Sequence, residues 1–392
     1  MKARQRLLRM INFVYSGFCR LLLFRLSAQR AHQLVLMQLG WLERWRLPVI
    51  MAGRLRAWLM PARAVEVGGA KLSARLILAA GLVKGRGFSS EDGALRAAGQ
   101  GDAKFMPGWR MLPALVGPVE FGSFPRWPRL GNAGTTLWRQ QATQSTQNRV
   151  GLRNPGARAA AAFLGARKER LPPDFGINIA VSPGLSELAR QQREITESLQ
   201  FFLAEDLRPS WITLNISCPN TEDDPSGHQL EAGARALCTA FIAELRSRKL
   251  EIPLWVKVGP GLAATQYHML MRIFAEVGVR AVIATNTLAK PSPSDPAMNA
   301  GVGGGALRAS ALRAVRELQI AKARLGCKVD IIGCGGVVDG ESLHDYSRLG
   351  AVAMQYWSAL VFRGPFAAAL IESELDHHER SYAASHRERL AG

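Results

Sequence analysis

Short apolar runs alternate with amphipathic helical stretches along most of the chain after about Leu72. Eight such runs, rich in β-branched residues, span 76–80, 118–122, 176–180, 211–215, 254–258, 281–285, 329–333 and 352–355. Strands that alternate with helices build parallel sheets, and eight units of this kind predict an α/β protein with a closed (β/α)8 TIM barrel. An open doubly wound sheet is the competing architecture, but no Gly-x-Gly-x-x-Gly motif follows the first strand.

Polar or glycine residues stand at or near the end of every predicted strand. The C-terminal ends of barrel strands are where active sites lie, so these residues predict a site at one mouth of the barrel. In strand order they are Gly81 and Lys84, Ser123, Asn178, Asn215, Lys257, Asn286 with Thr287, Gly335 with Gly336, and Trp357 with Ser358.

The segment 211–221, WITLNISCPNT, concentrates this polar chemistry at the end of the fourth strand. Two carboxamides, Asn215 and Asn220, suit a planar ligand that alternates C=O and N–H groups, because an amide both donates and accepts. Cys218 offers a proton acceptor or nucleophile if its pKa is lowered. The alternative is a strand end whose asparagines only cap a loop.

Glycine clusters follow the sixth and seventh strands, at 301–305 and 335–336. In barrels, backbone N–H groups at this point commonly bind phosphate, and glycine allows the close approach. Lys257 near the centre of the mouth would stabilise negative charge on a reduced flavin ring. The alternatives are a flexible glycine loop and a strand-end lysine that pairs with a carboxylate.

Charge and cysteine content narrow the class of protein. Net charge is +19, and residues 1–63 hold twelve Lys/Arg but one acid, Glu43, which favours an anionic membrane surface. No zinc-finger spacing or RNA-binding signature supports nucleic-acid binding. The five cysteines show no Cys-x-x-Cys, so neither a disulfide framework nor a metal site is expected.

The N-terminal region is predicted to be a separate helical unit. Residues 1–60 show two or three helices, the second opening near Ser27, with tryptophans and arginines flanking apolar faces. Such helices lie in a membrane interface or, alternatively, pack as a cap on the barrel. No run of 18 uncharged apolar residues exists, so no transmembrane helix is expected. A secretory signal lacks its small-residue cleavage site, whereas a mitochondrial presequence stays open on composition. We divide the chain into a helical extension (1–65), a barrel (66–380) and a polar tail (381–392).

Ordered motifs over 26–371 resemble the dihydroorotate dehydrogenase family. They are AAGLVKG (79–85), VEFGS (119–123), NRVGLRNPG (148–156), GINIA (176–180), LNISCPNT (214–221), VKV (256–258), VIATNT (282–287), IIGCGG (331–336) and SALVFRGP (358–365). The run LFRLSAQRAHQLVLMQL (23–39) further resembles the membrane-associated, quinone-linked class. The resemblance implies FMN-dependent oxidation of (S)-dihydroorotate to orotate in pyrimidine biosynthesis. It also implies peripheral attachment to the cytoplasmic face of a membrane, the inner membrane in a bacterium.

The resemblance also implies roles for individual residues. Cys218 corresponds to the catalytic base, and Arg139 to an arginine at the quinone tunnel. The substrate would contact Lys84, Asn148, Asn215, Asn220, Asn286 and Thr287. FMN would contact Ala80, Gly81, Ser123, Asn178, Asn215, Lys257, Thr285, Gly303, Gly304, Gly335, Gly336, Trp357 and Ser358.

This chain departs from the family pattern at several positions. Cys218 stands where the quinone-linked class has serine, Val83 replaces an acid, and 181–183 replaces a lysine-containing loop. These departures keep two alternatives open. One is a diverged FMN oxidoreductase with another cyclic amide or another acceptor, and the other is a catalytically silent flavin-binding paralogue.

Overall fold

The computed structural model describes residues 2–60, 63–102, 105–217 and 230–377, and its centre is a closed parallel barrel. The strands are hydrogen-bonded in the order β10-β13-β14-β3-β4-β7-β8-β9, which confirms the predicted TIM barrel. Their bounds are β3 Leu76–Leu78, β4 Val119–Phe124, β7 Phe175–Ala180, β8 Trp211–Asn215, β9 Leu254–Val258, β10 Ala281–Ala284, β13 Asp330–Cys334 and β14 Ala353–Tyr356.

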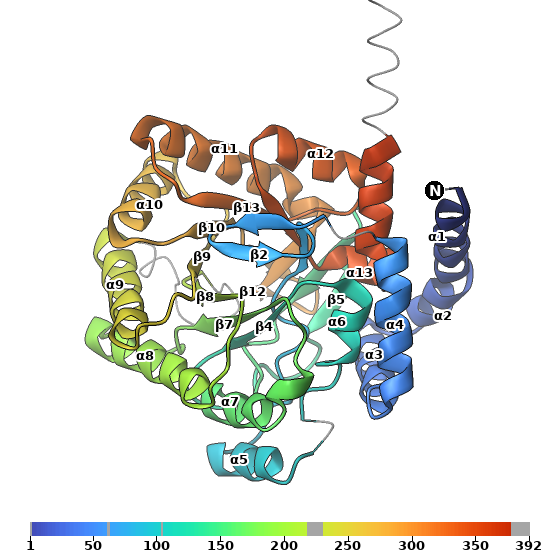
Figure 1. Ribbon diagram of the computed structural model, residues 1–392, viewed down its shortest axis with the longest axis horizontal. Coiled ribbons are helices and arrows are strands. Elements are labelled where there is room, and N and C mark those ends of the chain that lie inside the picture. The colour runs from blue at the N-terminus through green and yellow to red at the C-terminus, as the bar shows by residue number, and fades with distance from the viewer. Residues whose placement is uncertain (1, 61–62, 103–104, 218–229, 378–392) are drawn as a thin grey trace, which may run out of the picture.

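Helices surround this barrel on its outer side (Figure 1). They occupy the amphipathic stretches between the strands, where apolar residues recur at helical spacing. The bounds are α5 Glu91–Gly99, α6 Met111–Val116, α7 Ala157–Gly165, α8 Leu188–Ala204, α9 Glu231–Ser247, α10 Ala264–Val277, α11 Arg308–Leu325, α12 Gly340–Arg348 and α13 Ser358–Arg363.

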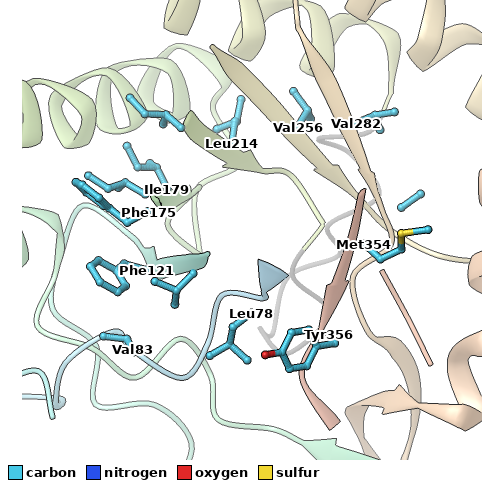
Figure 2. Packing of buried hydrophobic residues seen from close by; sticks show 14 of the residues in the cluster. Leu78, Val83, Phe121, Phe175, Ile179, Leu214, Val256, Val282, Met354 and Tyr356 are labelled. Atoms are coloured by element: carbon cyan, nitrogen blue, oxygen red, sulfur yellow. The ribbon is translucent and has the colours of Figure 1, made fainter. Parts of the chain in front are cut away.

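The hydrophobic core is divided between two layers by the alternation of side chains along each strand. Figure 2 shows part of the outer layer, in which Phe121, Leu214 and Val256 lie between strands and helices. The inner layer holds polar residues towards the mouth of the barrel and apolar ones below them. Successive strand residues point to opposite faces, so Leu214 packs outward while its neighbour Asn215 faces the interior.

A short hairpin and two tryptophans close the other end of the barrel. The hairpin pairs β1 (Val65–Val67) with β2 (Ala70–Leu72) and crosses the barrel end in Figure 1. Above it, the indoles of Trp211 and Trp255 stack with ring centroids 4.6 Å apart, and Trp255 Nε1 donates to Gly68 O at 3.2 Å. This floor is buried and apolar, so the described cavity opens towards the mouth.

A four-stranded antiparallel sheet, absent from the sequence prediction, forms from two hairpins at the mouth. Its order is β11-β12-β6-β5, with bounds β5 Leu137–Gln140, β6 Ser145–Asn148, β11 Leu288–Ser292 and β12 Asp295–Gly304. Most of the first glycine cluster therefore lies in strand β12 rather than in a flexible loop. Pairing with β6 fixes the glycine backbone beside the cavity.

The N-terminal region is helical, as predicted. It comprises α1 (Lys2–Val14), a π-helical turn (Tyr15–Cys19), α2 (Arg20–Arg25), α3 (Ala28–Leu42) and α4 (Arg46–Leu59). Ser27 caps α3 by accepting from Arg30 N at 3.3 Å. The segment Ala3–Arg25 is long and apolar enough, by length and composition, to cross a membrane. A search for uncharged runs misses it because Arg9 and Arg20 interrupt it.

Specific polar contacts attach this helical region to the barrel. Tyr15 Oη donates to Val361 O at 2.8 Å and Arg20 Nη1 to Phe362 O at 3.1 Å, both on α13. The Glu43 carboxylate is buried and accepts from backbone N–H groups of Gly108, Arg110 and Met111. Burial raises the pKa of Glu43, and those N–H donors oppose the rise. The single acid of residues 1–63 thus joins the helices to the barrel.

Candidate active site

A cavity of about 900 Å³ lies at the C-terminal mouth of the barrel, between the strand ends, the antiparallel sheet and α3. Among the described predicted site residues, all but Asn178 and Arg139 line it. The lining members are Ala80, Gly81, Lys84, Ser123, Asn148, Asn215, Lys257, Thr285, Asn286, Thr287, Gly303, Gly304, Gly335, Gly336, Trp357 and Ser358. Cys218 and Asn220, the predicted base and one substrate ligand, lie outside the described residues, as does the acidic segment 222–229.

Two asparagines from different strands meet at the centre of the mouth. Asn286 Nδ2 donates to Ser217 O at 2.8 Å and to Asn215 Oδ1 at 3.3 Å. Asn215 Nδ2 in turn donates to Ser123 Oγ at 3.1 Å. These bonds orient the carboxamides, because the donor and acceptor ends of an amide are not interchangeable. The sequence analysis paired Asn215 with Asn220. Within the described residues, Asn215 instead forms its amide pair with Asn286.

Lys257 reaches the cavity from below. Its side chain is largely buried, and Nζ donates to Gln355 Oε1 at 2.9 Å. The Cys334 thiol lies beside it, and burial raises the pKa of this thiol while Lys257 opposes the rise. The site thus holds a cation close to a wall of uncharged groups, where electrostatic effects are strong.

Glycines form a close-fitting backbone cradle on another side of the cavity. Gly304 and Gly336 have φ of +85° and +71°. A Cβ at residue 336 would lie 2.6 Å from Arg308 Cβ, and one at residue 304 would lie 2.7 Å from Ser145 Cα. Ser358 Oγ, at the start of α13, hydrogen-bonds Thr146 Oγ1 at 2.7 Å beside this cradle. Glycine backbone that allows close approach, together with hydroxyls beside it, suits an oxyanion or phosphate.

Orphaned polar atoms support a ligand with hydrogen-bonding edges. Among the described residues, Asn178 Oδ1 and Thr287 Oγ1 are buried without a hydrogen-bond partner. A buried acceptor or hydroxyl left unpaired costs free energy, so such groups commonly serve a ligand. Thr287 lines the cavity, and with the glycine cradle and Lys257 it would suit FMN, whose phosphate would lie at the glycines and whose polar ring edge would lie near the lysine.

Helix α3 forms the remaining wall, and here sequence reasoning missed a residue. His32 lines the cavity, its ring centroid 6.4 Å from the Trp357 ring. Burial, and secondarily the Lys84 charge, lower the pKa of His32 to about 4, so this imidazole is neutral at pH 7. The sequence placed His32 on a helix, but only the packing of α3 brings it to the site.

Arg139 lies on β5 and does not line the cavity. Its guanidinium donates to the carbonyls of Leu23 and Leu26 and stands 4.2 Å over the Phe24 ring. Burial lowers the pKa of Arg139. In this structure the arginine expected at a quinone tunnel anchors α2 to the antiparallel sheet.

Glu120 and Gln355 also escaped the sequence analysis. Both are fully buried inside the barrel, and the available signal was a polar residue within an otherwise apolar strand. Gln355 lines the floor of the cavity, and Glu120 lies beyond it.

The closed barrel and the polar cavity at its mouth define the class of TIM-barrel enzymes with active sites at the strand ends. Residues 64–378 match the family model for dihydroorotate dehydrogenase, and the chain belongs to that family.

Curated relatives carry a more specific name. "Dihydroorotate dehydrogenase (quinone)" of Streptomyces coelicolor is 28% identical over 374 residues, covering 90% of this chain and 91% of that protein. The protein of the same name from Leifsonia xyli subsp. xyli is 29% identical over 369 residues, covering 91% and 97%. The crystal structure of DHODH from Eimeria tenella in complex with ferulenol has the same fold, with a TM-score of 0.66 at 20% identity, covering 87% of this chain and 93% of its own.

Proposed function

We propose that this chain oxidises (S)-dihydroorotate to orotate with FMN as cofactor and a quinone as electron acceptor, a step of pyrimidine biosynthesis. The observation that carries the proposal is one cavity holding a buried lysine, an oriented asparagine pair and a glycine cradle. The family membership and the names of the relatives support the same reaction.

The substrate would be held by amide groups from several strand ends. Asn148, Asn215, Asn286 and Thr287, with Asn220, would bind the ring amides and the carboxylate, and Lys84 would add positive charge. An amide pair locked by hydrogen bonds presents donors and acceptors in one arrangement, which favours a cyclic imide-like ring over an aliphatic acid. Buried polar groups left unpaired by the wrong ring would oppose its binding.

Proton and hydride removal require separate groups. Cys218 is the proposed base for the C5 proton, since a thiol titrates below a hydroxyl and works closer to neutral pH. FMN, when bound, supplies the ring that accepts the hydride from C6. The Lys257 ammonium would stabilise negative charge arriving on that ring, from the dry side of the cavity. The neutral imidazole of His32, on α3, would face the cavity without adding charge.

The N-terminal helices would attach the protein peripherally to the cytoplasmic face of a membrane and admit the quinone. They expose large apolar side chains beside arginines: Met10, Phe13, Phe18, Leu21, Leu22, Trp41, Trp45, Leu47 and Met51. Apolar contact combined with positive charge favours an anionic lipid surface. Because α3 also lines the cavity, a lipid-soluble acceptor would have a short path to it.

Anaerobic addition of dihydroorotate to the FMN-loaded protein tests the reaction. The visible flavin band should bleach and return when a quinone is added. The Cys218→Ala variant should keep the oxidised flavin spectrum but bleach far more slowly, whereas Cys327→Ala, away from the cavity, should behave as the parent. A band unchanged by dihydroorotate would contradict the substrate. A protein that takes up no FMN would overturn the whole proposal.

A further inference from the structure

Glu120 on β4 is a carboxylate sealed inside the barrel, below the cavity and outside its lining. It is fully buried, and its two oxygens accept four side-chain hydrogen bonds. The donors are Asn178 Nδ2 at 2.5 Å, Trp211 Nε1 at 3.1 Å, Thr213 Oγ1 at 2.9 Å and Gln355 Nε2 at 2.8 Å. So many partners, drawn from β7, β8 and β14, fix the carboxylate in one place.

Gln355 connects this carboxylate to Lys257. Its Nε2 donates to Glu120 Oε2 at 2.8 Å, while its Oε1 accepts from Lys257 Nζ at 2.9 Å. A carboxylate only accepts and an ammonium only donates, so the two ends dictate the same orientation of the amide. Hydrogen bonds in such a chain polarise one another, which transmits the negative charge of Glu120 towards Lys257.

The surroundings of Lys257 make its connection to Glu120 important for the charge balance of the site. Among the described residues, the titratable groups facing its ammonium are Glu120, through Gln355, and the Cys334 thiol on β13. Burial raises the pKa of that thiol, so Cys334 is neutral at pH 7 and supplies no compensating charge. A buried ammonium without an anion tends to lose its proton. Glu120 is therefore the compensating anion in the described part of the chain.

The barrel floor keeps water away from this arrangement. The Trp211 indole that donates to Glu120 stacks on Trp255, and the hairpin of β1 and β2 covers both. Gly176 makes room for the indole, because a Cβ there would overlap the Trp211 ring. In such a dry site, charge acts over a longer range than at the surface.

We propose that Glu120 is a positioning residue which, through Gln355, stabilises the Lys257 ammonium and directs it at the flavin ring. This inference rests on the proposed function, since it takes Lys257 to face FMN. Loss of the anion removes that stabilisation, and the flavin then loses its neighbouring cation at a lower pH.

The test is the reduction potential of bound FMN, measured by dye equilibration from pH 6 to pH 10, in the parent, Glu120→Gln and Gln355→Leu. Loss of a cation beside the flavin makes reduction of FMN harder, and the curve breaks where this happens. Without the anion the ammonium is less stabilised, so both variants should break at a lower pH than the parent. Glu120→Asp should restore much of the parent curve.

Thr213→Val is the matched control. It removes one donor to Glu120 but leaves the bridge to Lys257 intact, so its curve should follow that of the parent. If Glu120→Gln does not fold, Gln355→Leu carries the same prediction with both charges retained. If the potential of each variant differs from that of the parent by the same amount at every pH, the inference is overturned. Glu120 would then have a purely structural role. A parent that takes up no FMN would overturn the proposed function as well.

Discussion

Alanine at residue 304 should damage the glycine cradle, while alanine at residue 303 should not. Gly304 has φ +85° and ψ −156°, a region almost restricted to glycine that costs about 1–3 kcal/mol for other residues. A Cβ there would also meet the Gln144 carbonyl oxygen and lie 2.7 Å from Ser145 Cα. Both obstacles are backbone atoms of the paired hairpin, so they cannot turn aside as a side chain would.

Overpacking of this kind adds about 1–3 kcal/mol, which gives a total of about 2–6 kcal/mol for Gly304→Ala. At Gly303 the nearest atoms to an added Cβ are 3.7–3.9 Å away, an ordinary contact. Gly303→Ala is therefore a matched control for packing strain, measured as unfolding free energy, from the adjacent residue and the same strand.

Urea unfolding of the apo protein and fluorescence titration with FMN would measure the two consequences. Strain that stays in the folded protein lowers its unfolding free energy, and strain relieved by movement of the cradle weakens FMN binding. A loss of 4 kcal/mol in binding corresponds to about a thousandfold in Kd. If Gly304→Ala matched Gly303→Ala in both measurements, the cradle geometry would be wrong.

Three further predictions concern other parts of the molecule. Lys257→Met should slow flavin reduction by dihydroorotate by about 100- to 1,000-fold in stopped flow. Substitution of an exposed lysine, Lys290→Met, should leave the rate unchanged. Equal rates for the two variants would show that the Lys257 ammonium does not assist the reaction. Because the pKa of His32 falls from 6.5 to about 4 on folding, the unfolded chain binds the extra proton between these values, and stability should fall as pH drops through this window. His32→Gln should flatten that dependence in denaturation curves from pH 4 to 7, and an equally steep curve would contradict the burial of the imidazole. Deletion of residues 1–25 should reduce sedimentation with anionic vesicles while FMN stays bound; undiminished sedimentation would place the membrane contact elsewhere.

The sequence predicted the barrel because each strand is a compact apolar run followed by a helix of regular period. The predicted strands 211–215 and 254–258 coincide with β8 and β9. These elements are determined locally, by periodicity and by turn residues. The closed strand order confirms the expectation drawn from their number.

The antiparallel sheet was not predicted because its strands lack that local signal. β5 and β6 are polar, and β12 is rich in glycine, so propensity and alternation both favour loops there. They become strands by pairing with one another across more than a hundred residues of sequence. A pattern within one segment cannot report such a partner.

The site was predicted unevenly for a related reason. Residues at strand ends, such as Asn215 and Lys257, are found by their position relative to an apolar run. His32 is not, because its place in the cavity depends on how α3 packs. The tunnel position of Arg139 stays a prediction from the resemblance, while its contact with the backbone of α2 follows from packing.

Helix α13 links the N-terminal helices to the glycine cradle over a very short path. It begins at Ser358, beside the cradle, and its carbonyls at Val361 and Phe362 accept the hydrogen bonds of Tyr15 and Arg20. Six helical residues span only about 9 Å. With the proposed membrane attachment, the flavin would lie close to the lipid headgroups, so a lipid-soluble acceptor would remain in the bilayer during electron transfer. The depth at which the protein lies in the headgroup layer would then set the rate at which the quinone reoxidises the flavin.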